Sequence, residues 1–488
     1  MELRVKLLKW SAGRPVVILH NKLARRMSLH LSDRILIRKG SKKIISIVDF
    51  SQDLVKENQI AISIEVCKKL RLSSGEKVKI ASTSSPESIK FISEKLKCKR
   101  LKKRELEVIV RDIVTNALTE AEVAYFVSSI YRCGMTLKEI KYLTEAMVSS
   151  GKKLKLKGKL IADKHSIGGV AGRTTPIVVS ICAAAGIIIP KTSSRAITTA
   201  AGTADALETI CGVEFSIKEI KKIIRKVGAC MVWGGSLGLA PADDKIIQVE
   251  KLLKLDPEPQ LIASIMAKKL AVSSKYVILH IPYGKNAKVD KKGGLSLERK
   301  FKKLAKKFRI KVRCILTKAE EPYGKGIGPV LEMRDVIQVL KREDPCHMLE
   351  KKSLLLAAGL LELTGVAKRG GGYKLAYKIL DSKLALKKFK EIIKAQKGKI
   401  VNLETSGLKK DIKSLREGIV KEIDNKKINS VAIASGCPLD KGSGVYLHKH
   451  IGDKVNKGEN ILTIYAESRS ELNEAVEAYS KLKPLKIL

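Results

Sequence analysis

The spacing of hydrophobic residues changes several times along the chain, and each change predicts a different kind of structure. Over residues 1–96, short β-branched runs such as VVILH, KIISIVDF and KVKIAS alternate with turns, which predicts a compact β domain. Over 104–160 the apolar residues recur at helical spacing. Thr119 and Glu122 have the spacing of a capping box, and the same spacing recurs from Thr136. A lobe of successive helices is therefore expected there.

The next stretch, 161–255, alternates between short apolar runs and helical runs. Residues 160–162 and 187–190 are expected strands, and the loops 163–172 and 192–199 follow them. Each loop leads into a helical run. A strand–loop–helix unit that occurs twice is typical of an α/β lobe, in which ligands bind at the carboxyl ends of the parallel strands.

The remaining chain completes this plan. Residues 256–285 form a helix and strand that we assign in part to the helical lobe, and 286–425 return to the α/β lobe. Residues 426–488 are expected to be a β domain that resembles a barrel-sandwich hybrid, with GDKVNKGENIL as a turn between strands. No lysine stands at the hairpin tip that a lipoyl or biotin carrier needs, so this domain is interpreted as structural. The fold class is a multidomain α/β and α+β protein.

Composition excludes several classes. Hydrophobic residues make up 44% of the 488-residue chain, which is enough for more than one core. No apolar run is long enough to span a bilayer, and no signal peptide is visible, so a cytoplasmic protein without a membrane partner is expected. The nine cysteines are scattered, which favours buried, reduced thiols over a metal or disulfide role.

The net charge of +46 comes from 96 Lys and Arg against 50 Asp and Glu. The lysines are spread along the whole chain, and aromatic residues are only 4%, so few side chains can stack on bases. Specific nucleic-acid binding is therefore not expected. Anionic substrates, or a cytoplasm that is salty or hot, explain the charge as well.

The two loops of the central stretch carry the candidate chemistry. They read DKHSIGGVAGRTT and KTSSRAITTAAGT, and small residues let a ligand oxygen approach backbone N–H groups at the start of a helix. Lys164, Lys191 and Arg195 add positive charge. Thr175 is expected to cap the first helix, with Pro176 in its first position. These features predict an enzyme that handles phosphate.

Four blocks in this order, DKHSIGGV, KTSSRAIT..AGTAD.LE, SIMAKKLA and GKGIGP.LE, resemble the thymidine and pyrimidine nucleoside phosphorylase family. The extra N-terminal β domain makes the chain most similar to the archaeal AMP phosphorylases within it. The resemblance implies phosphorolysis of a nucleoside 5′-monophosphate, in which AMP and orthophosphate give adenine and ribose 1,5-bisphosphate. CMP and UMP are further possible substrates. It implies no metal or organic cofactor, and a homo-oligomer that is a dimer or larger.

The resemblance also assigns site residues. It implies that phosphate is bound by Lys164, Ser166, Thr175 and Ser193. It implies that the nucleotide is bound by Gly168, Ser194, Arg195, Ala196, Ile197, Thr198, Thr199, Thr203, Ser264 and Lys288. It implies that Asp256 is the catalytic residue and protonates the leaving base. The local sequence alone also fits an ordinary helix cap at Asp256, because Pro257 follows it.

Two departures from the pyrimidine-specific members bear on the substrate. Val249 and Glu250 stand where those members have an Arg-Asp pair that reads a pyrimidine carbonyl. Residues 199–202, Thr-Ala-Ala-Gly, stand where those members have His-Thr-Gly-Gly, which makes room for a 5′-phosphate. His165 is kept and is expected near the base, whereas the role of Lys268 stays open.

Three alternatives remain. A pyrimidine nucleoside phosphorylase acting on thymidine or uridine would have the same fold. An anthranilate phosphoribosyltransferase-like enzyme would need magnesium ligands and a GTGGD-type first loop, where this chain has DKHSIGGV. An RNA-binding protein with a degenerate enzyme core would bind RNA with a steep salt dependence and release no base.

Overall fold

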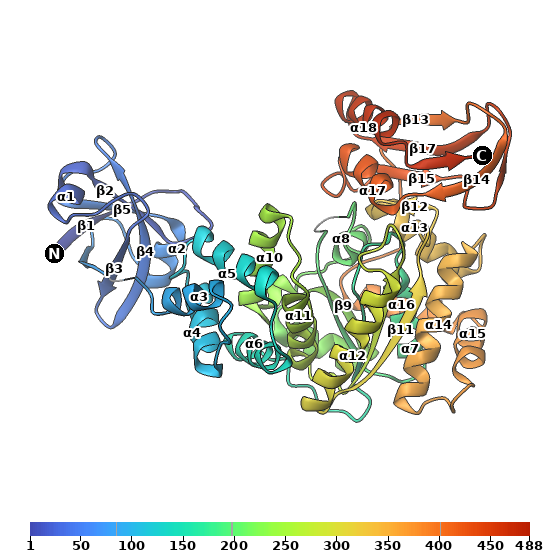
Figure 1. Cartoon of the computed structure of the whole chain (residues 1–488), viewed down its shortest axis with the longest axis horizontal. Helices are drawn as coiled ribbons and strands as arrows, with labels where there is room; N and C mark the ends of the chain where they lie inside the picture. The colour runs from blue at the N-terminus through green and yellow to red at the C-terminus, as the bar shows by residue number, and fades with distance from the viewer. Residues whose placement is uncertain (84, 197–198, 401) are drawn as a thin grey trace. The chain divides into compact units, whose positions relative to one another are not determined.

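The computed structural model describes residues 1–83, 85–196, 199–400 and 402–488 (Figure 1). The chain forms two compact units. The first comprises residues 1–150 and 241–263, and the second comprises 151–240 and 264–488. Within the described ranges, no helix is long and apolar enough to cross a membrane.

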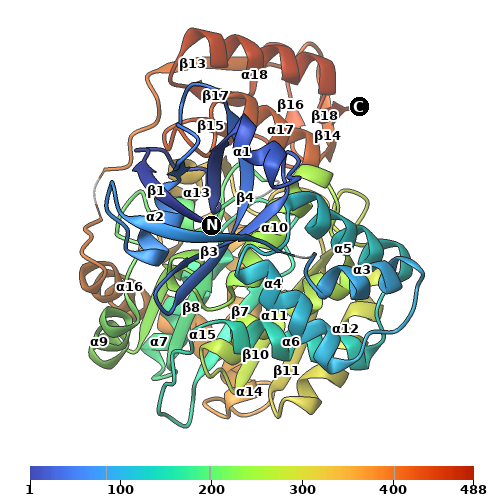
Figure 2. The ribbon, with the colours of Figure 1, turned by 90° about the vertical axis from the view of Figure 1, so that its left-hand side faces the viewer.

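The N-terminal β domain of the first unit is a closed six-stranded barrel, drawn in blue in Figures 1 and 2. Every second side chain points inward, and residues such as Val17, Leu19, Ile35 and Ile37 are fully buried. The predicted β domain is therefore confirmed. In chain order the strands and short helices are β1 (Glu2–Leu7), β2 (Val16–His20), α1 (Asn21–Arg26), β3 (Arg34–Lys39), β4 (Lys42–Ser51), β5 (Gln59–Ile62), α2 (Ile64–Leu70) and β6 (Lys77–Ser82).

Helices make up the rest of the first unit. Thr119 is the N-cap of α5 and exchanges capping-box hydrogen bonds with Glu122, as the sequence predicts. Thr136 and Glu139 do the same at the start of α6. The helices are α3 (Ser88–Leu96), α4 (Lys103–Val114), α5 (Glu120–Cys133), α6 (Leu137–Ser150), α10 (Pro241–Leu253) and the first residues of α11 (Glu258–Ala271).

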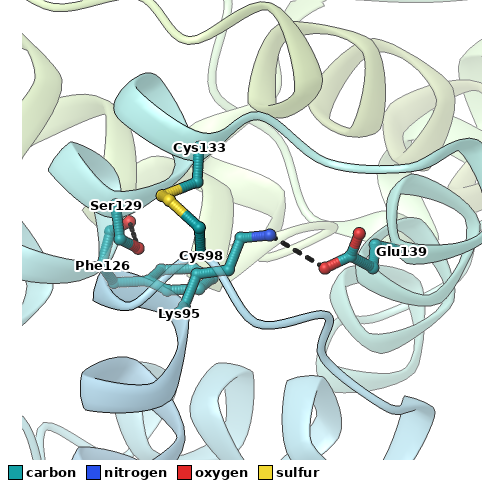
Figure 3. The surroundings of a disulfide bond; sticks show 6 residues. All are labelled: Lys95, Cys98, Phe126, Ser129, Cys133 and Glu139. Carbon is teal, nitrogen blue, oxygen red and sulfur yellow. Dashed lines mark hydrogen bonds and ion pairs between the residues drawn. A yellow bond between two sulfur atoms is a disulfide. The ribbon is translucent and has the colours of Figure 1, made fainter.

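A disulfide joins Cys98, just after α3, to Cys133 at the end of α5 (Figure 3). The expectation that all nine cysteines are reduced thiols is therefore wrong for this pair. The other seven are free, and five of them are buried. The pair lies 35 residues apart in sequence, and only the packing of α3 against α5 brings the two sulfurs together. Beside it, the buried Lys95 ammonium pairs with Glu139 at 2.9 Å.

Parallel strands form the centre of the second unit. One sheet has the order β11–β10–β7 and another pairs β8 with β9, all in parallel. A single parallel bridge between Ile161 and Ile188 links them. The strands are β7 (Ala162–Ser166), β8 (Ile189–Ser193), β9 (Ala229–Trp233), β10 (Tyr276–Tyr283) and β11 (Lys311–Lys318).

Helices cover both faces of this sheet. Gly359 of α14 lies against Ile278 and Ile315, whereas Gly294 of α12 lies against Ile281 and Leu316. Side chains alternate between faces along a strand, so α14 and α12 pack on opposite faces. The helices of this lobe are α7 (Thr174–Ala184), α8 (Thr203–Leu207), α9 (Ile217–Val227), the 3₁₀ turn η1 (Gly235–Leu237), the end of α11, α12 (Lys291–Lys307), α13 (Pro329–Lys341), α14 (His347–Thr364), α15 (Gly372–Asp381) and α16 (Leu384–Ala395).

Three local expectations in the central stretch are wrong by a few residues. Residues 163–166 were expected to begin the first loop, but they lie in β7, which pairs with β10 along its whole length. Thr192 and Ser193 likewise end β8 and do not start the second loop. Thr175 lies inside the first turn of α7, whose N-cap is Arg173. The polar residues of both strands break the apolar pattern by which a strand is recognised in a sequence.

The C-terminal part contains antiparallel strands, as expected, and also two helices, α17 (Asn425–Ala434) and α18 (Arg469–Leu482). Its strands start before residue 426, the start expected from the sequence. One sheet has the order β12–β15–β17–β13 and the other β16–β14–β18. The strands are β12 (Gly326–Ile327), β13 (Leu408–Lys413), β14 (Gly418–Ile423), β15 (Gly444–Leu447), β16 (Lys454–Val455), β17 (Asn460–Ala466) and β18 (Leu485–Ile487). The predicted mixed multidomain fold is confirmed.

Candidate active site

The predicted phosphate and nucleotide loops leave the sheet at one edge. β7 ends at Ser166 and β8 at Ser193, and the two strands run parallel. β10, between β7 and β11, ends at Tyr283 on the same edge. Because the carboxyl ends of parallel strands meet at one edge, the first and second loops face a common region, where α/β proteins bind ligands.

Two buried lysines lie at this edge. Lys164 Nζ donates hydrogen bonds to the hydroxyls of Thr174 and Thr175, at 2.9 and 3.1 Å. Lys191 Nζ donates to the carbonyl oxygen of Thr192. Burial, with the charges of Lys191 and Arg173 next, lowers the pKa of Lys164 to about 7. Burial, with the charge of Lys269 next, lowers the pKa of Lys191 to about 7 as well.

One carboxylate partly balances these cations. Asp163 accepts a 2.6 Å contact from Lys269 Nζ, and both side chains are completely buried. Its other oxygen accepts the backbone N–H of Lys164 at 2.7 Å. Among the described residues, neither Lys164 nor Lys191 has a carboxylate within salt-bridge distance. The cluster therefore holds an excess of positive charge in a buried place, which favours a bound anion.

His165 lies among the same charges. Burial is the main cause that lowers its pKa well below the usual value, and the charges of Lys269, Lys191, Lys268 and Lys164 act in the same direction. The imidazole is therefore neutral at pH 7. It can donate a hydrogen bond at one nitrogen and accept one at the other, but it adds no charge.

Two hydroxyl groups at the end of β8 are buried without a partner. Thr192 Oγ1 and Ser193 Oγ have no hydrogen-bond partner among the described residues. Buried polar groups usually have one, because leaving them unpaired costs free energy. Ser193 is one of the residues that the sequence assigns to phosphate, and its hydroxyl is suited to a ligand oxygen.

The first loop is held by its neighbours. Gly169 has φ +90°, and a Cβ there would lie 3.2 Å from the backbone nitrogen of Lys288. The predicted nucleotide ligand Lys288 is thus brought against this loop. Ala171 accepts a 2.9 Å hydrogen bond from Tyr323 N, and Gly172 packs on Tyr323. Only a residue without a side chain allows these approaches.

Arg173, which follows the first loop, ties it to the second. Its guanidinium contacts Glu332 of α13 and donates to the carbonyl oxygen of Ala201 in the second loop. The backbone N–H of Ala200 donates to Asn429 Oδ1 of α17 at 3.0 Å. Arg173 therefore links the first loop to the second, and Asn429 of α17 holds the second loop as well.

Asp205 organises the second loop from within α8. Its carboxylate accepts the N–H of Ala196 at 2.7 Å and that of Gly202 at 2.8 Å, which folds the loop back on itself. Arg195 is held by Glu208 at 2.7 Å, by Glu214 at 3.1 Å and by Asp205 at 3.2 Å. The Arg195 guanidinium is thus engaged by carboxylates.

Other residues named from the sequence lie in several places. Ser264 and Lys268 share one face of α11, and Lys268 Nζ donates to Ser264 Oγ at 3.4 Å. Asp256 lies in the first compact unit, and the other predicted residues that the structure describes lie in the second. Ile197 and Thr198 lie outside the described residues. Thr199 donates to the carbonyl oxygen of Ala201, and Thr203 is the first residue of α8.

The structure also brings in residues that the sequence did not single out. Thr174 and Thr175 both accept hydrogen bonds from the Lys164 ammonium. Asp163 and Lys269 form the buried ion pair, and Asp205 shapes the second loop. In the sequence these residues lie in the segments RTT, DKHS, KKLA and GTAD, next to residues that were singled out, and this proximity is the signal that could have indicated them. Within the described ranges, no group of three His, Cys, Asp or Glu side chains is placed to hold a metal ion.

Comparison with known proteins identifies the domains of the chain. Residues 89–151 match the helical bundle domain of a glycosyl transferase family, and residues 158–295 match the a/b domain of the same family. Residues 419–485 match the pyrimidine nucleoside phosphorylase C-terminal domain. The solved anthranilate phosphoribosyltransferase of Thermus thermophilus is similar in fold, with a TM-score of 0.53 at 15% identity over 63% of this chain and 99% of that one.

Fold and site thus define a pentosyltransferase of the nucleoside phosphorylase class. The AMP phosphorylase of Pyrococcus furiosus is 41% identical over 99% of this chain and 97% of its own length, and that of Thermococcus kodakarensis is 41% identical over 100% and 98%. AMP phosphorylase 1 of Archaeoglobus fulgidus is 38% identical over 98% and 95%. The chain belongs to the AMP phosphorylase family, and the predicted family is confirmed.

Proposed function

We propose that this protein catalyses the phosphorolysis of AMP to adenine and ribose 1,5-bisphosphate. The observation that carries the proposal is the buried cationic cluster of Lys164, Lys191 and Lys269, which a single carboxylate, Asp163, partly balances. Such a cluster favours a multiply charged anion and discriminates against water. The family to which the chain belongs uses a nucleotide and phosphate, and CMP and UMP are further substrates to test.

Orthophosphate is held by Lys164, Ser166, Thr175 and Ser193 in this proposal. The Ser193 hydroxyl is buried without a protein partner in the described chain, and the Lys164 ammonium lies beside Thr175. A phosphate oxygen attacks C1′ while the bond from C1′ to the base breaks, and the electron pair of that bond leaves with the base. Holding the two reactants in line accounts for most of the acceleration.

The nucleotide is held along the first and second loops. We assign its contacts to Gly168, Ser194, Arg195, Ala196, Ile197, Thr198, Thr199, Thr203, Ser264 and Lys288. Asp205 supports this assignment because it fixes the backbone at Ala196 and Gly202. The approach of Lys288 to Gly169 supports it as well. Arg195 contributes through its backbone.

Asp256 is proposed as the acid that gives a proton to the departing base. Helix α11 begins at Glu258, and the carbonyl oxygen of Pro257 accepts the N–H of Leu261 at 3.0 Å. Asp256 thus lies two residues before the first residue of the helix. Protonating the base contributes roughly 10²–10⁴-fold in reactions of this kind.

The deciding experiment incubates the purified protein with phosphate and AMP, CMP, UMP, adenosine or uridine, and measures free base. Release of adenine and ribose 1,5-bisphosphate from AMP is expected, with activity kept when a chelator is present. Equal turnover of adenosine and AMP contradicts a site for the 5′-phosphate. Preference for uridine points to a pyrimidine nucleoside phosphorylase, and dependence on magnesium points to a phosphoribosyltransferase.

Several broader assignments belong to the same proposal. The protein works in the cytoplasm, where nucleotides and orthophosphate are found, as a homo-oligomer and without a specific nucleic-acid partner. We keep as a working division the domains 1–96, 104–160 with 256–285, 161–255 with 286–425, and 426–488. Sedimentation analysis and an RNA-binding titration over a range of salt test the oligomer and the partner.

A further inference from the structure

A chain of polar side chains runs beneath the first loop and ends at the proposed phosphate ligand Ser166. Ser166 Oγ lies 3.4 Å from His280 Nδ1, and His280 Nε2 lies 2.9 Å from Thr317 Oγ1. Thr317 Oγ1 in turn lies 3.4 Å from the hydroxyl of Tyr323. The four residues come from β7, β10, β11 and the loop after β11. Three neighbouring strands thus hold Ser166, His280 and Thr317, and the loop after β11 supplies Tyr323.

The three inner members are buried and uncharged. His280 is 1% exposed, Tyr323 3% and Thr317 7%. Burial, with the charges of Lys164 and Lys352, lowers the pKa of His280 well below its usual value. Burial raises the pKa of Tyr323 to about 12, so its phenol keeps the proton. A neutral imidazole donates at one nitrogen and accepts at the other, so the series has a direction.

The hydrogen bonds of this series can be donated in either of two directions. The direction decides whether the Ser166 hydroxyl is available to donate to a ligand. If His280 Nε2–H donates to Thr317, Nδ1 accepts the hydrogen bond of the Ser166 hydroxyl, which then has no proton left to donate to another group. If Tyr323 donates to Thr317 and Thr317 to Nε2, then Nδ1–H donates to Ser166. Gly168 N also donates to Ser166 Oγ, at 3.4 Å. In the second case the serine oxygen accepts twice, and its proton points elsewhere.

We propose that Tyr323, Thr317 and His280 are positioning residues that form a one-way donor relay to Ser166, whose hydroxyl proton is thereby directed at orthophosphate. This proposal rests on the proposed function, which makes Ser166 a phosphate ligand. Three of the four oxygens of hydrogen phosphate carry no proton and can only accept, so binding of one of them at Ser166 requires that hydroxyl to donate and fixes the relay in the second direction. Tyr323 also holds the first loop through Ala171, which couples loop position to relay geometry.

The C-terminal part contains a matched histidine–threonine pair with the opposite direction. His448 Nε2 lies 2.8 Å from Thr463 Oγ1, and Thr463 donates to Asp411 at 2.6 Å. The carboxylate accepts only, so His448 must donate to Thr463. Thr463→Val therefore removes the same kind of contact without touching the proposed relay, and it serves as the control.

The kinetic test compares Thr317→Val, Thr317→Ser and Tyr323→Phe with the wild type, measuring KM for phosphate and for AMP. Thr317→Val and Tyr323→Phe are expected to raise the phosphate KM about tenfold, which corresponds to about 1.4 kcal/mol. Their AMP KM should stay within about twofold, the factor by which we separate positioning from general damage. Thr317→Ser keeps the hydroxyl and should behave like the wild type, as should Thr463→Val. An unchanged phosphate KM in Tyr323→Phe overturns the relay, even if Thr317→Val fails to fold.

A second readout does not need catalysis. Nitrogen NMR of ¹⁵N-histidine-labelled protein, assigned with His280→Gln, shows which ring nitrogen carries the proton. Addition of inorganic phosphate is expected to give the Nδ1–H form of His280, and the Nε2–H form in the presence of phosphate overturns the proposal. If the wild type releases no base from AMP but phosphate still selects the Nδ1–H form, the proposed reaction fails and the relay stands.

Discussion

The two lysines with a pKa of about 7 make phosphate binding a proton-linked event. Near pH 8 the free protein holds Lys164 and Lys191 mostly uncharged. A bound dianion favours the ammonium forms and raises both pKa values. Binding should therefore take up protons, as many as one for each lysine, and affinity should fall as pH rises above about 7.

Calorimetric titration with phosphate in buffers of different ionisation enthalpy measures this uptake. Lys164→Met is expected to reduce it. Lys285→Met is the control, because this exposed lysine pairs with Glu422, which raises its pKa. Binding at pH 8 without proton uptake would show that phosphate leaves the protonation of the two lysines unchanged, which contradicts the prediction.

The buried pair of Asp163 and Lys269 gives a stability prediction. Asp163→Asn leaves the Lys269 charge without a partner in a dry interior, which costs about 3–5 kcal/mol of unfolding free energy. Denaturant unfolding measures the loss. Asp163→Asn combined with Lys269→Met should be less destabilised than the single variant, because no unpaired charge is left. The exposed pair Lys318–Glu320 is the control, where Glu320→Gln should change little.

Site residues divide into those that the sequence reveals and those that only tertiary contacts reveal. Lys164, Ser166 and Ser193 stand in recognisable blocks and could be proposed at once. His280 and Thr317 lie in apolar strands 37 residues apart, and only the parallel pairing of β10 with β11 brings them into contact. A lone histidine in an apolar run gives no local signal of such a contact.

At the scale of elements, helix ends were predicted better than strands. The capping boxes at Thr119 and Thr136 place the starts of α5 and α6 correctly, because a cap is a contact between residues three apart. The strand β7 was expected only at residues 160–162, and its extent to Ser166 was missed because its residues, ADKHS, are mostly polar. Its polar side chains interact with residues remote in sequence, as Asp163 does with Lys269. Strand propensity depends on local residue types and does not include such contacts.

The short helix α8 carries a prediction of its own. Asp205→Asn weakens the bonds that hold the second loop, since a neutral amide accepts less strongly than a carboxylate. The KM for AMP is expected to rise about tenfold, the loss of one charge-assisted hydrogen bond, with the phosphate KM little changed. Glu219→Gln, at the capping box of α9, is the control. An equal rise in both KM values would show that Asp205 supports the fold as a whole and not the second loop in particular.

At the scale of the whole molecule, the Cys98–Cys133 disulfide closes a loop with a sequence separation of 35 residues in the first unit. Closing such a loop stabilises a fold by about 2–4 kcal/mol through the entropy of the unfolded chain. Cys98→Ser with Cys133→Ser should lower the melting temperature, and a reductant should do the same to the wild type. Cys314→Ser, which changes a free thiol, is the control. A reductant that shifts the double variant equally would point to another cause.

The net charge of +46 makes the folded chain repel itself, and this repulsion competes with the salt bridges. Most of those bridges have exposed members and contribute about 0–1 kcal/mol each. Salt screens both effects, and potassium chloride from about 0.01 to about 1 M shortens the Debye length from ~30 to ~3 Å. With 96 basic against 50 acidic side chains, the repulsion is the larger sum, so the melting temperature should rise with salt.

Chloride is the right anion for this scan, because phosphate would also stabilise the fold by binding the proposed site. A melting temperature that falls with salt would mean that the ion pairs outweigh the excess charge, and the lysines would then be better explained as partners in a stabilising network than as a response to a salty cytoplasm.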